Sequence, residues 1–359
     1  MKQQLTTILL AALAVATGWS QGVTTPRTPS PAAKLTQTIG ISTVTVDYSR
    51  PSVRDREIWG SLVPYGWNVE TFGAGNPAPW RSGANENTVI KLSHAAKIAG
   101  KDVSAGKYGL FFVINKDNTG EVILSKDYRS WGNYWYDPAN DQLRANIAIR
   151  DHAHTETLTF DFINFSKNSA ELVLNWEKKQ FPVKIEFAVD EIVMANAEEE
   201  LKGTTGFSPQ GYTSAVNYAI QNDVALDKAL VWADKAVAQN KGFGSLTMKA
   251  TLLYKTGKNA EAEKLETKAL EIGGTEAEVN QYGYTLLGAG QHDAAIRIFK
   301  LNTERHPESA NCWDSLGEGY ATKGEKEKAI KAFKKSLGMN PPANVKANSE
   351  KYLKQLGAL

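Results

Sequence analysis

Cysteine is almost absent from this chain of 359 residues: Cys312 is the only one, so no disulfide can form within the chain. The fold must therefore be stabilised by packed cores rather than by cross-links. Cys312 itself lies in a helical pattern and is expected to be a small buried residue rather than a nucleophile.

An excess of charge of either sign is missing too. The 41 Lys and Arg residues nearly balance the 39 Asp and Glu residues, which leaves a formal net charge of +2. This balance favours neither nucleic acid nor an anionic membrane as a partner. The sequence also has no phosphate-binding loop, dinucleotide fingerprint or paired-cysteine metal site, so no cofactor is expected.

Long apolar runs are missing except near the start of the chain. Lys2 precedes an apolar run over residues 5–16, and Gly18 and Ser20 form the small-x-small pattern that signal peptidase accepts. This predicts a signal peptide over 1–21, with a retained membrane anchor as the alternative. We expect an exported protein without a membrane span after cleavage, in the periplasm of a Gram-negative bacterium rather than outside the cell.

The next two segments differ in composition and in the pattern of their apolar residues. Residues 22–34 are rich in Pro, Thr and Ser and are expected to be an extended leader. Residues 35–189 contain short apolar runs separated by turn-forming residues, and Leu158, Phe160 and Phe162 alternate with polar residues. A period of two with one polar face is typical of antiparallel sheets. Eight or nine such strands predict an all-β antiparallel sandwich.

One stretch of this β-region shows little periodicity. Residues 51–87 contain Trp59, Trp67 and Trp80 together with several Gly and Pro residues. A loop this long is either a functional surface or a lid over one end of the sandwich.

The second half of the chain is helical and repetitive. Residues 190–209 are expected to form a helix and linker, and six positions within 210–359 recur at a spacing of 34 residues. The recurring pairs are Gly283 and Gly317, Gly290 and Gly324, Ala295 and Ala329, Ile296 and Ile330, Phe299 and Phe333, and Pro307 and Pro341. The pattern resembles the tetratricopeptide repeat, which implies an all-α helical solenoid after the β-sandwich.

The spacing predicts four helical hairpins and a final capping helix at about 344–357. Gly317 and Ala329 are expected where two helices cross closely, Gly324 in a left-handed turn, and Phe333 between neighbouring hairpins. A solenoid of this kind has a concave face. We expect a protein or peptide partner on that face; support of the β-domain or pairing with a second copy are the alternatives.

The β-region also carries a series of motifs in a fixed order. They are YSRPS from residue 48, REIWG from residue 56, LVPYG from residue 62, WRSGANENT from residue 80, IAGKDVSAGKY from residue 98 and WG from residue 131. The series resembles the uncharacterised domain family numbered 2911, found in exported proteins of Gram-negative bacteria. That family has no established function, so the resemblance implies a fold and a location but no activity. Residues 67–79 resemble an insertion between two of its motifs.

These motifs supply the best candidate site. Arginine offers forked donors for carboxylate, phosphate or sugar hydroxyls, and tryptophan offers flat apolar faces for a sugar or a peptide. The alternative is structural, with Arg81 and Glu86 pairing to hold the loop and Trp80 filling the end of the sandwich. The ligand-binding candidates are Arg50, Arg56, Trp80, Arg81, Asn85, Glu86 and Trp131.

A metal site is the weaker candidate. His152 and His154 on one strand could point the same way and hold a metal ion. They lie between two strand patterns, which favours a solvated hairpin tip instead. No metal is therefore assigned.

The leading hypothesis is an exported, non-catalytic binding or assembly protein. Its repeats hold a protein partner, and its β-domain binds a ligand, such as a glycan, or packs on the repeats. One alternative is an enzyme that processes envelope or polysaccharide material around Arg81 and Glu86; another is a purely structural pair of domains.

The signal peptide can be tested directly. In a Gram-negative host the protein should fractionate with the periplasm, and N-terminal sequencing should begin at Gln21 or Gly22, because cleavage is expected after Ser20 or Gln21. Recovery from the inner membrane with Met1 retained would instead indicate an anchor.

Overall fold

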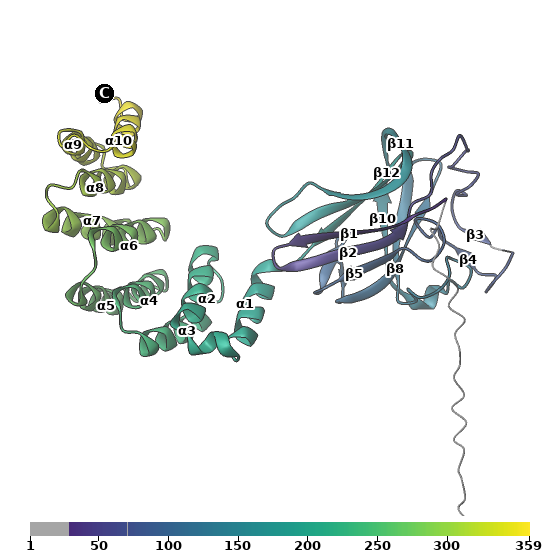
Figure 1. Ribbon diagram of the computed structural model, residues 1–359, viewed down its shortest axis with the longest axis horizontal. Coiled ribbons are helices and arrows are strands. Elements are labelled where there is room, and N and C mark those ends of the chain that lie inside the picture. The colour runs from purple at the N-terminus through teal and green to yellow at the C-terminus, as the bar shows by residue number, and fades with distance from the viewer. Residues whose placement is uncertain (1–28, 70) are drawn as a thin grey trace, which may run out of the picture. The chain divides into compact units, whose positions relative to one another are not determined.

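The computed structural model describes residues 29–69 and 71–359, which form two compact units that divide after Phe187 (Figure 1). We call them the β-unit and the repeat unit. The predicted signal peptide and most of the expected leader lie outside the described residues. Within the described part of the chain, no helix is long and apolar enough to cross a membrane.

The β-unit consists of two antiparallel sheets and a short additional ladder. The sheet orders are β1-β2-β5-β8-β9-β10 and β11-β12-β6-β7, and β3 pairs with β4. The strands are β1 (Ala32–Ile39), β2 (Ser42–Ser49), β3 (Asn68–Val69), β4 (Pro77–Ala78), β5 (Val89–Leu92), β6 (Ala96–Ile98), β7 (Lys101–Val103), β8 (Gly106–Ile114), β9 (Thr119–Ser125), β10 (Asp141–Ala148), β11 (Arg150–Ile163) and β12 (Ser169–Glu186). A short 3-10 turn, Pro138–Asn140, precedes β10.

The alternating strands bury one face between the two sheets. Leu158, Phe160 and Phe162 are all buried, as the period of two predicted. The rings of Phe160 in β11 and Tyr48 in β2 lie 4.9 Å apart, and those of Phe112 in β8 and Phe181 in β12 lie 5.1 Å apart. These contacts join the two sheets, so the predicted antiparallel sandwich is confirmed.

One boundary differs from the prediction. β1 begins at Ala32, inside the expected leader, because its whole length pairs with β2. The long strand β12 contains two apolar runs, 170–176 and 181–185, and continues between them through Glu177 at a φ of 52°. A local irregularity in the pairing with β11 accommodates that residue without ending the strand.

The outer face of β8 and β9 is covered by the loop that lacked periodicity. Phe111 and Val113 of β8 form a buried cluster with Ala78 and Tyr136, and Trp67 packs against it. β8 is therefore buried on both faces. Residues 67–79, which resemble an insertion, are thus packed on the sheet near both of their ends, through Trp67 and Ala78.

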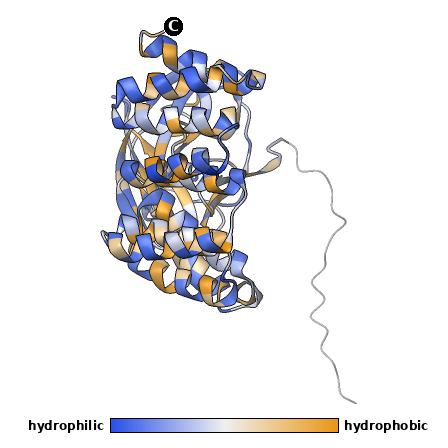
Figure 2. Ribbon diagram, turned by 90° about the vertical axis from the view of Figure 1, so that its left-hand side faces the viewer, coloured by the Kyte–Doolittle hydropathy of each residue, from blue (hydrophilic) through white to orange (hydrophobic). Residues whose placement is uncertain are grey.

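The repeat unit contains the predicted four hairpins and a final helix. A helix, α1 (Val189–Glu200), and a 3-10 turn, Thr204–Phe207, precede them. The hairpins are α2 (Pro209–Asn222) with α3 (Leu226–Gln239), α4 (Phe243–Lys255) with α5 (Asn259–Ile272), α6 (Glu276–Gly288) with α7 (His292–Arg305), and α8 (Ala310–Lys323) with α9 (Lys326–Leu337). The capping helix is α10 (Ala343–Gln355). Figure 2 shows hydrophilic and hydrophobic residues mixed along the helices, as expected where each buries one side.

Close helix crossings explain the recurring glycines. A Cβ atom at Gly317 in α8 would lie 2.7 Å from ring atoms of Phe333 in α9. Gly283 in α6 meets Phe299 in α7 in the same way. Gly324 ends α8 with a φ of 85°, as predicted for a left-handed turn. Cys312 is fully buried, and burial raises the pKa of its thiol to about 11, which leaves it unreactive.

A buried carboxylate joins four helices of this unit, α4 to α7. The carboxylate of Glu266 accepts hydrogen bonds from the hydroxyls of Tyr254 and Tyr282 at 3.1 and 3.2 Å, and from Nη2 of Arg297 at 3.0 Å. Desolvation raises the pKa of Tyr254 to about 12. Both tyrosines therefore remain neutral donors, and the one buried charge is compensated.

The glycine crossing supports a matched pair of substitutions. Gly317→Ala should lower the free energy of unfolding of the repeat unit by about 1–3 kcal/mol, because the added methyl overlaps the Phe333 ring. Gly288→Ala, at a helical position with open space, should leave it unchanged or raise it by up to about 1 kcal/mol. Urea unfolding followed by helical circular dichroism measures both. Equal effects would contradict the close crossing.

Candidate functional site

A pocket of about 550 Å³ lies in the β-unit. Its walls come from the long loop, from Asn133 and Tyr134, and from Trp176 of β12. Three of the predicted ligand-binding residues line it: Arg56, Trp80 and Arg81. The loop that was expected to be a functional surface or a lid thus forms most of the wall.

Trp80 is held in place by both its backbone and its ring. Its N–H donates to the carbonyl of Phe112 in β8 and its carbonyl accepts from the same residue, each at 2.9 Å. The indole stacks on that of Trp176 at 5.7 Å and 14°, and meets Trp59 edge-on at 5.8 Å. Phe181 lies 6.0 Å away. Trp80 therefore fills the end of the sandwich and lines the pocket at once.

Trp176 carries an unsatisfied buried donor behind the pocket. Its side chain is 1% exposed, and its indole Nε1 has no hydrogen-bond partner among the described residues. A buried donor without an acceptor costs about 1–3 kcal/mol, which the aromatic packing around this ring must offset.

Arg81 is fixed by a tight local packing. Its Nη1 donates to the carbonyl of Asn85 at 3.1 Å, and its guanidinium lies 5.6 Å from the ring centre of Tyr134. Gly132, at a φ of 64°, lies directly beside this side chain, and a Cβ atom there would overlap Nη1. Because the glycine of the Trp-Gly motif has no side chain, the guanidinium of Arg81 can occupy the space beside it.

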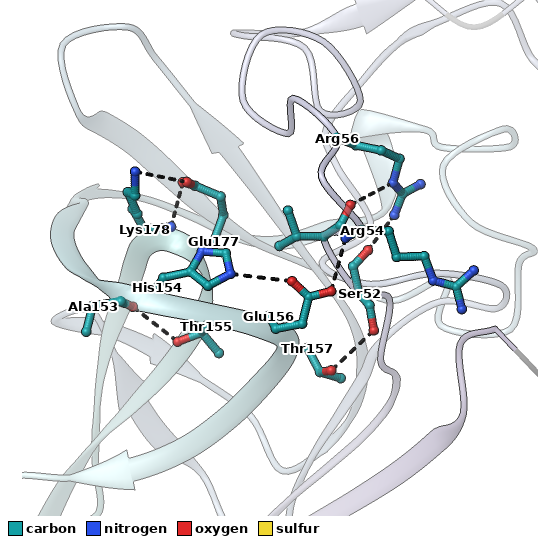
Figure 3. A network of polar contacts seen from close by, with 11 residues as sticks. Ser52, Arg54, Arg56, Ala153, His154, Thr155, Glu156, Thr157, Glu177 and Lys178 are labelled. Carbon is teal, nitrogen blue, oxygen red and sulfur yellow. Dashed lines mark hydrogen bonds and ion pairs between the residues drawn. The ribbon is translucent and has the colours of Figure 1, made fainter.

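A short turn, drawn in Figure 3, carries two further arginines, and both belong to the pocket lining. The backbone N–H of Arg54 donates to Oε1 of Glu156 at 3.0 Å, and the hydroxyls of Ser52 and Thr157 lie 3.2 Å apart. These contacts attach the turn to β11. The hydrogen bond from Arg54 is the main reason that the pKa of the Glu156 carboxyl is lowered.

The two arginine side chains of this turn differ in their partners. Arg56 donates to the carbonyls of Val53 at 3.0 Å and Ser52 at 2.5 Å. The guanidinium of Arg54 is exposed and has no partner among the described residues (Figure 3). Since none of the described residues that line the pocket is Asp or Glu, its three arginines give it a positive charge.

The other predicted residues lie outside the lining. Arg50 donates to the Leu158 carbonyl at 2.9 Å and to the Thr159 hydroxyl at 2.6 Å, which ties it to β11. The backbone carbonyl of Asn85 holds Arg81, and its side chain donates to the Ser30 carbonyl at 3.3 Å. Two more candidates that lie on the surface and do not line the pocket are Glu86 and Trp131.

The histidine pair is not at a hairpin tip, so that expectation was wrong. His152 and His154 both lie within β11, because the strand begins at Arg150. Nδ1 of His152 lies 2.7 Å from the Ala153 carbonyl, and Nε2 of His154 lies 3.4 Å from Oε2 of Glu156. The described residues contain no group of three or more His, Cys, Asp or Glu side chains placed to hold a metal ion.

Sequence reasoning missed most residues that line the pocket, among them the charged and aromatic residues Arg54, Tyr134 and Trp176. The position of Arg54 between two chosen arginines was an available signal. Tyr134 follows closely after the Trp-Gly motif. Trp176 had no such signal, because it ends an ordinary strand pattern and reaches the pocket only through sheet packing.

The repeat unit has a groove of about 610 Å³ between α7 and α9, over α8. Its floor includes Trp313, Leu316 and Tyr320. The ammonium groups of Lys300 and Lys328 lie 5.8 and 5.5 Å from the ring centre of Tyr320. The groove also includes Lys331, Lys335 and one acidic residue, Glu304, so its lining is basic.

The face shared by α6, α8 and α10 is different. Oε1 of Glu318 accepts from the Tyr284 hydroxyl at 3.0 Å and from Nδ2 of Asn348 at 2.7 Å. Asp314 accepts from Ser349 at 2.5 Å and from Asn348 at 2.8 Å. Helices α6, α8 and the capping helix α10 thus use polar groups of this face to bind one another.

Family comparisons agree with the two resemblances. Residues 30–185 match the family described as "Protein of unknown function (DUF2911)", and residues 310–342 match a tetratricopeptide repeat. Both parts of the predicted organisation are therefore confirmed. The motifs around the pocket belong to the first match, and α8 and α9 to the second.

Curated relatives match only short stretches. The chain is 40% identical over 55 residues to "Superkiller complex protein 3" of Mus musculus, and 39% identical over 59 residues to its Homo sapiens counterpart. These stretches are 15% and 16% of this chain and 4% of the length of each relative. The chain thus spans a small fraction of those proteins.

Solved structures resemble part of the chain. The crystal structure of MamA is 16% identical, covers 42% of this chain and 89% of its own, and has a TM-score of 0.30. For PilW, described as a widely conserved type IV pilus biogenesis factor, the values are 18%, 47%, 80% and 0.32. YrrB, described as a tetratricopeptide-repeat protein with an unusual peptide-binding site, gives 22%, 45%, 84% and 0.28. No function is assigned from these similarities.

A comparison of two tryptophans tests whether Trp80 stabilises the β-unit through its packing. Trp80→Ala should lower the free energy of unfolding of the β-unit by about 3 kcal/mol, because it removes a ring stacked within an aromatic cluster. Trp131→Ala should change it by less than about 1 kcal/mol, since that side chain is 50% exposed. Denaturant unfolding followed by near-ultraviolet circular dichroism distinguishes them. A small effect of Trp80→Ala would rule out the cluster as a support of the pocket.

Proposed function

We propose that this protein is an exported, non-catalytic binding or assembly protein whose repeat unit holds an acidic segment of a partner protein. The observation that carries the proposal is the groove between α7 and α9, where lysines surround an aromatic floor. The repeat unit is the interaction module, and the groove is the surface on it with complementary charge for such a segment.

The chemistry of the groove defines the segment. Lys300, Lys328 and Lys335 lie with their ammonium groups near aromatic rings, so their aliphatic stems cover apolar surface while their charges face solvent. Carboxylates of a bound segment would meet these charges. Apolar side chains between the carboxylates would contact Leu316 and Ala332 on the floor.

The β-unit pocket supports binding rather than catalysis. Glycoside hydrolysis by the usual route needs two carboxyl groups flanking the scissile bond. None of the described residues that line the pocket is acidic, and Glu86 lies outside the lining. This favours the binding hypothesis over an enzyme built around Arg81 and Glu86.

Export is the remaining part of the proposal. It is supported by the short charged and apolar start of the chain and by the small-x-small pattern that follows. The partner is then a protein of the same compartment, and the acidic segment is expected to be accessible there.

Peptide binding tests the proposal on the mature full-length protein. A short fluorescein-labelled peptide alternating Glu with Leu should bind, while the same peptide with Lys in place of Glu should not. Fluorescence anisotropy measures the affinity. Because the attraction is between charges, added salt should weaken it.

A matched pair of charge reversals locates the site. Lys331→Glu with Lys335→Glu should weaken binding by at least about tenfold, because both residues line the groove. Lys326→Glu with Lys334→Glu changes the net charge equally on the same helix outside the lining and should have little effect. Equal losses would show unspecific attraction, and no binding of either peptide would overturn the proposal.

A further inference from the structure

We propose that the β-unit pocket binds a small carboxylate ligand that carries a ring. This goes beyond the function proposed for the repeat unit and involves different residues. It rests on two features that meet in one pocket: the guanidinium groups of Arg54, Arg56 and Arg81, and the ring of Trp80.

The charge of the pocket calls for an anion. The guanidinium of Arg54 has no partner among the described residues, Arg56 donates only to two backbone carbonyls, and Arg81 donates to one. Each guanidinium has five N–H donors, so most of them remain available. No acidic side chain among the described lining residues competes for them. A carboxylate matches the forked geometry with two parallel hydrogen bonds.

The aromatic walls indicate the rest of the ligand. Trp80 is partly exposed toward the pocket and is stacked on Trp176, and Tyr134 lies beside Arg81. Flat apolar walls of this kind suit a ring. The volume of about 550 Å³ suits a small molecule of this size class and is too small for a folded partner.

The pocket is also built before any ligand arrives. Gly132 has no side chain, and the Arg81 guanidinium occupies the space beside it. The backbone of Trp80 is paired with β8. A donor that is held in this way, as Arg81 is, loses little conformational freedom on binding, which favours affinity for a small anion.

The mature full-length protein can be titrated by isothermal calorimetry with two matched pairs of probes. Phenylacetate is compared with phenylacetamide, and glucuronate with glucose, so that each pair differs in the charged group. Either acid should bind and its neutral partner should be at least about tenfold weaker, because the guanidinium contacts depend on charge. The first pair tests an aromatic acid and the second a sugar acid. Inorganic phosphate is a separate arm.

Single arginine substitutions then locate the binding. Arg54→Ala and Arg81→Ala should each weaken the acid at least about tenfold, whereas Arg129→Ala, an exposed arginine outside the lining, should not. The Arg54 side chain is exposed and has no hydrogen-bond or ion-pair partner among the residues that the structure describes, so its variant remains informative if Arg81→Ala is unstable. Equal binding of acids and neutral partners, tighter binding of phosphate alone, no binding of either acid, or unchanged affinity in Arg54→Ala would each overturn the inference.

Discussion

The stacking of Trp80 on Trp176 is the contact on which the β-unit pocket depends. One ring belongs to the long loop and the other to β12, and the backbone of Trp80 is paired with β8 in the opposite sheet. A single residue thus ties the loop to both layers of the sandwich. Aromatic rings bury a large area and prefer defined geometries. This contact therefore fixes the loop more firmly than the two-residue pairing of β3 with β4 could.

The arginines then follow from the fixed loop. Arg81 is the next residue after Trp80, and Gly132 leaves the space that its guanidinium fills. Arg54 and Arg56 come from a separate turn that is attached to β11 by Ser52 and the Arg54 backbone. Three positive charges therefore gather in one pocket although the chain as a whole has a net charge of only +2. Net charge describes a chain poorly when its charges are arranged locally.

The repeat unit obeys a different constraint. Two of its hairpins place a glycine directly against an aromatic ring, and the buried Glu266 is compensated by two tyrosines and Arg297. The groove between α7 and α9 arises because α8 lies between them with its aromatic side chains turned outward to the lysines. The pocket and the groove thus combine the same two kinds of side chain, cationic and aromatic, in different folds.

Patterns along the chain were sufficient for the architecture because they report local physics. A period of two buried Leu158, Phe160 and Phe162 on one face, and a spacing of 34 residues placed glycine opposite Phe333. The motifs around Trp80 and Arg81 also marked part of the pocket. Local patterns failed to give the ends of strands where strand pairing determines them. His152 lies inside a strand because β11 pairs with β12, and β12 continues through Glu177. The unsatisfied indole of Trp176, the exclusion of Arg50 and Glu86 from the lining, and the gathering of three arginines were decided only by tertiary structure, since burial and proximity depend on residues distant in sequence.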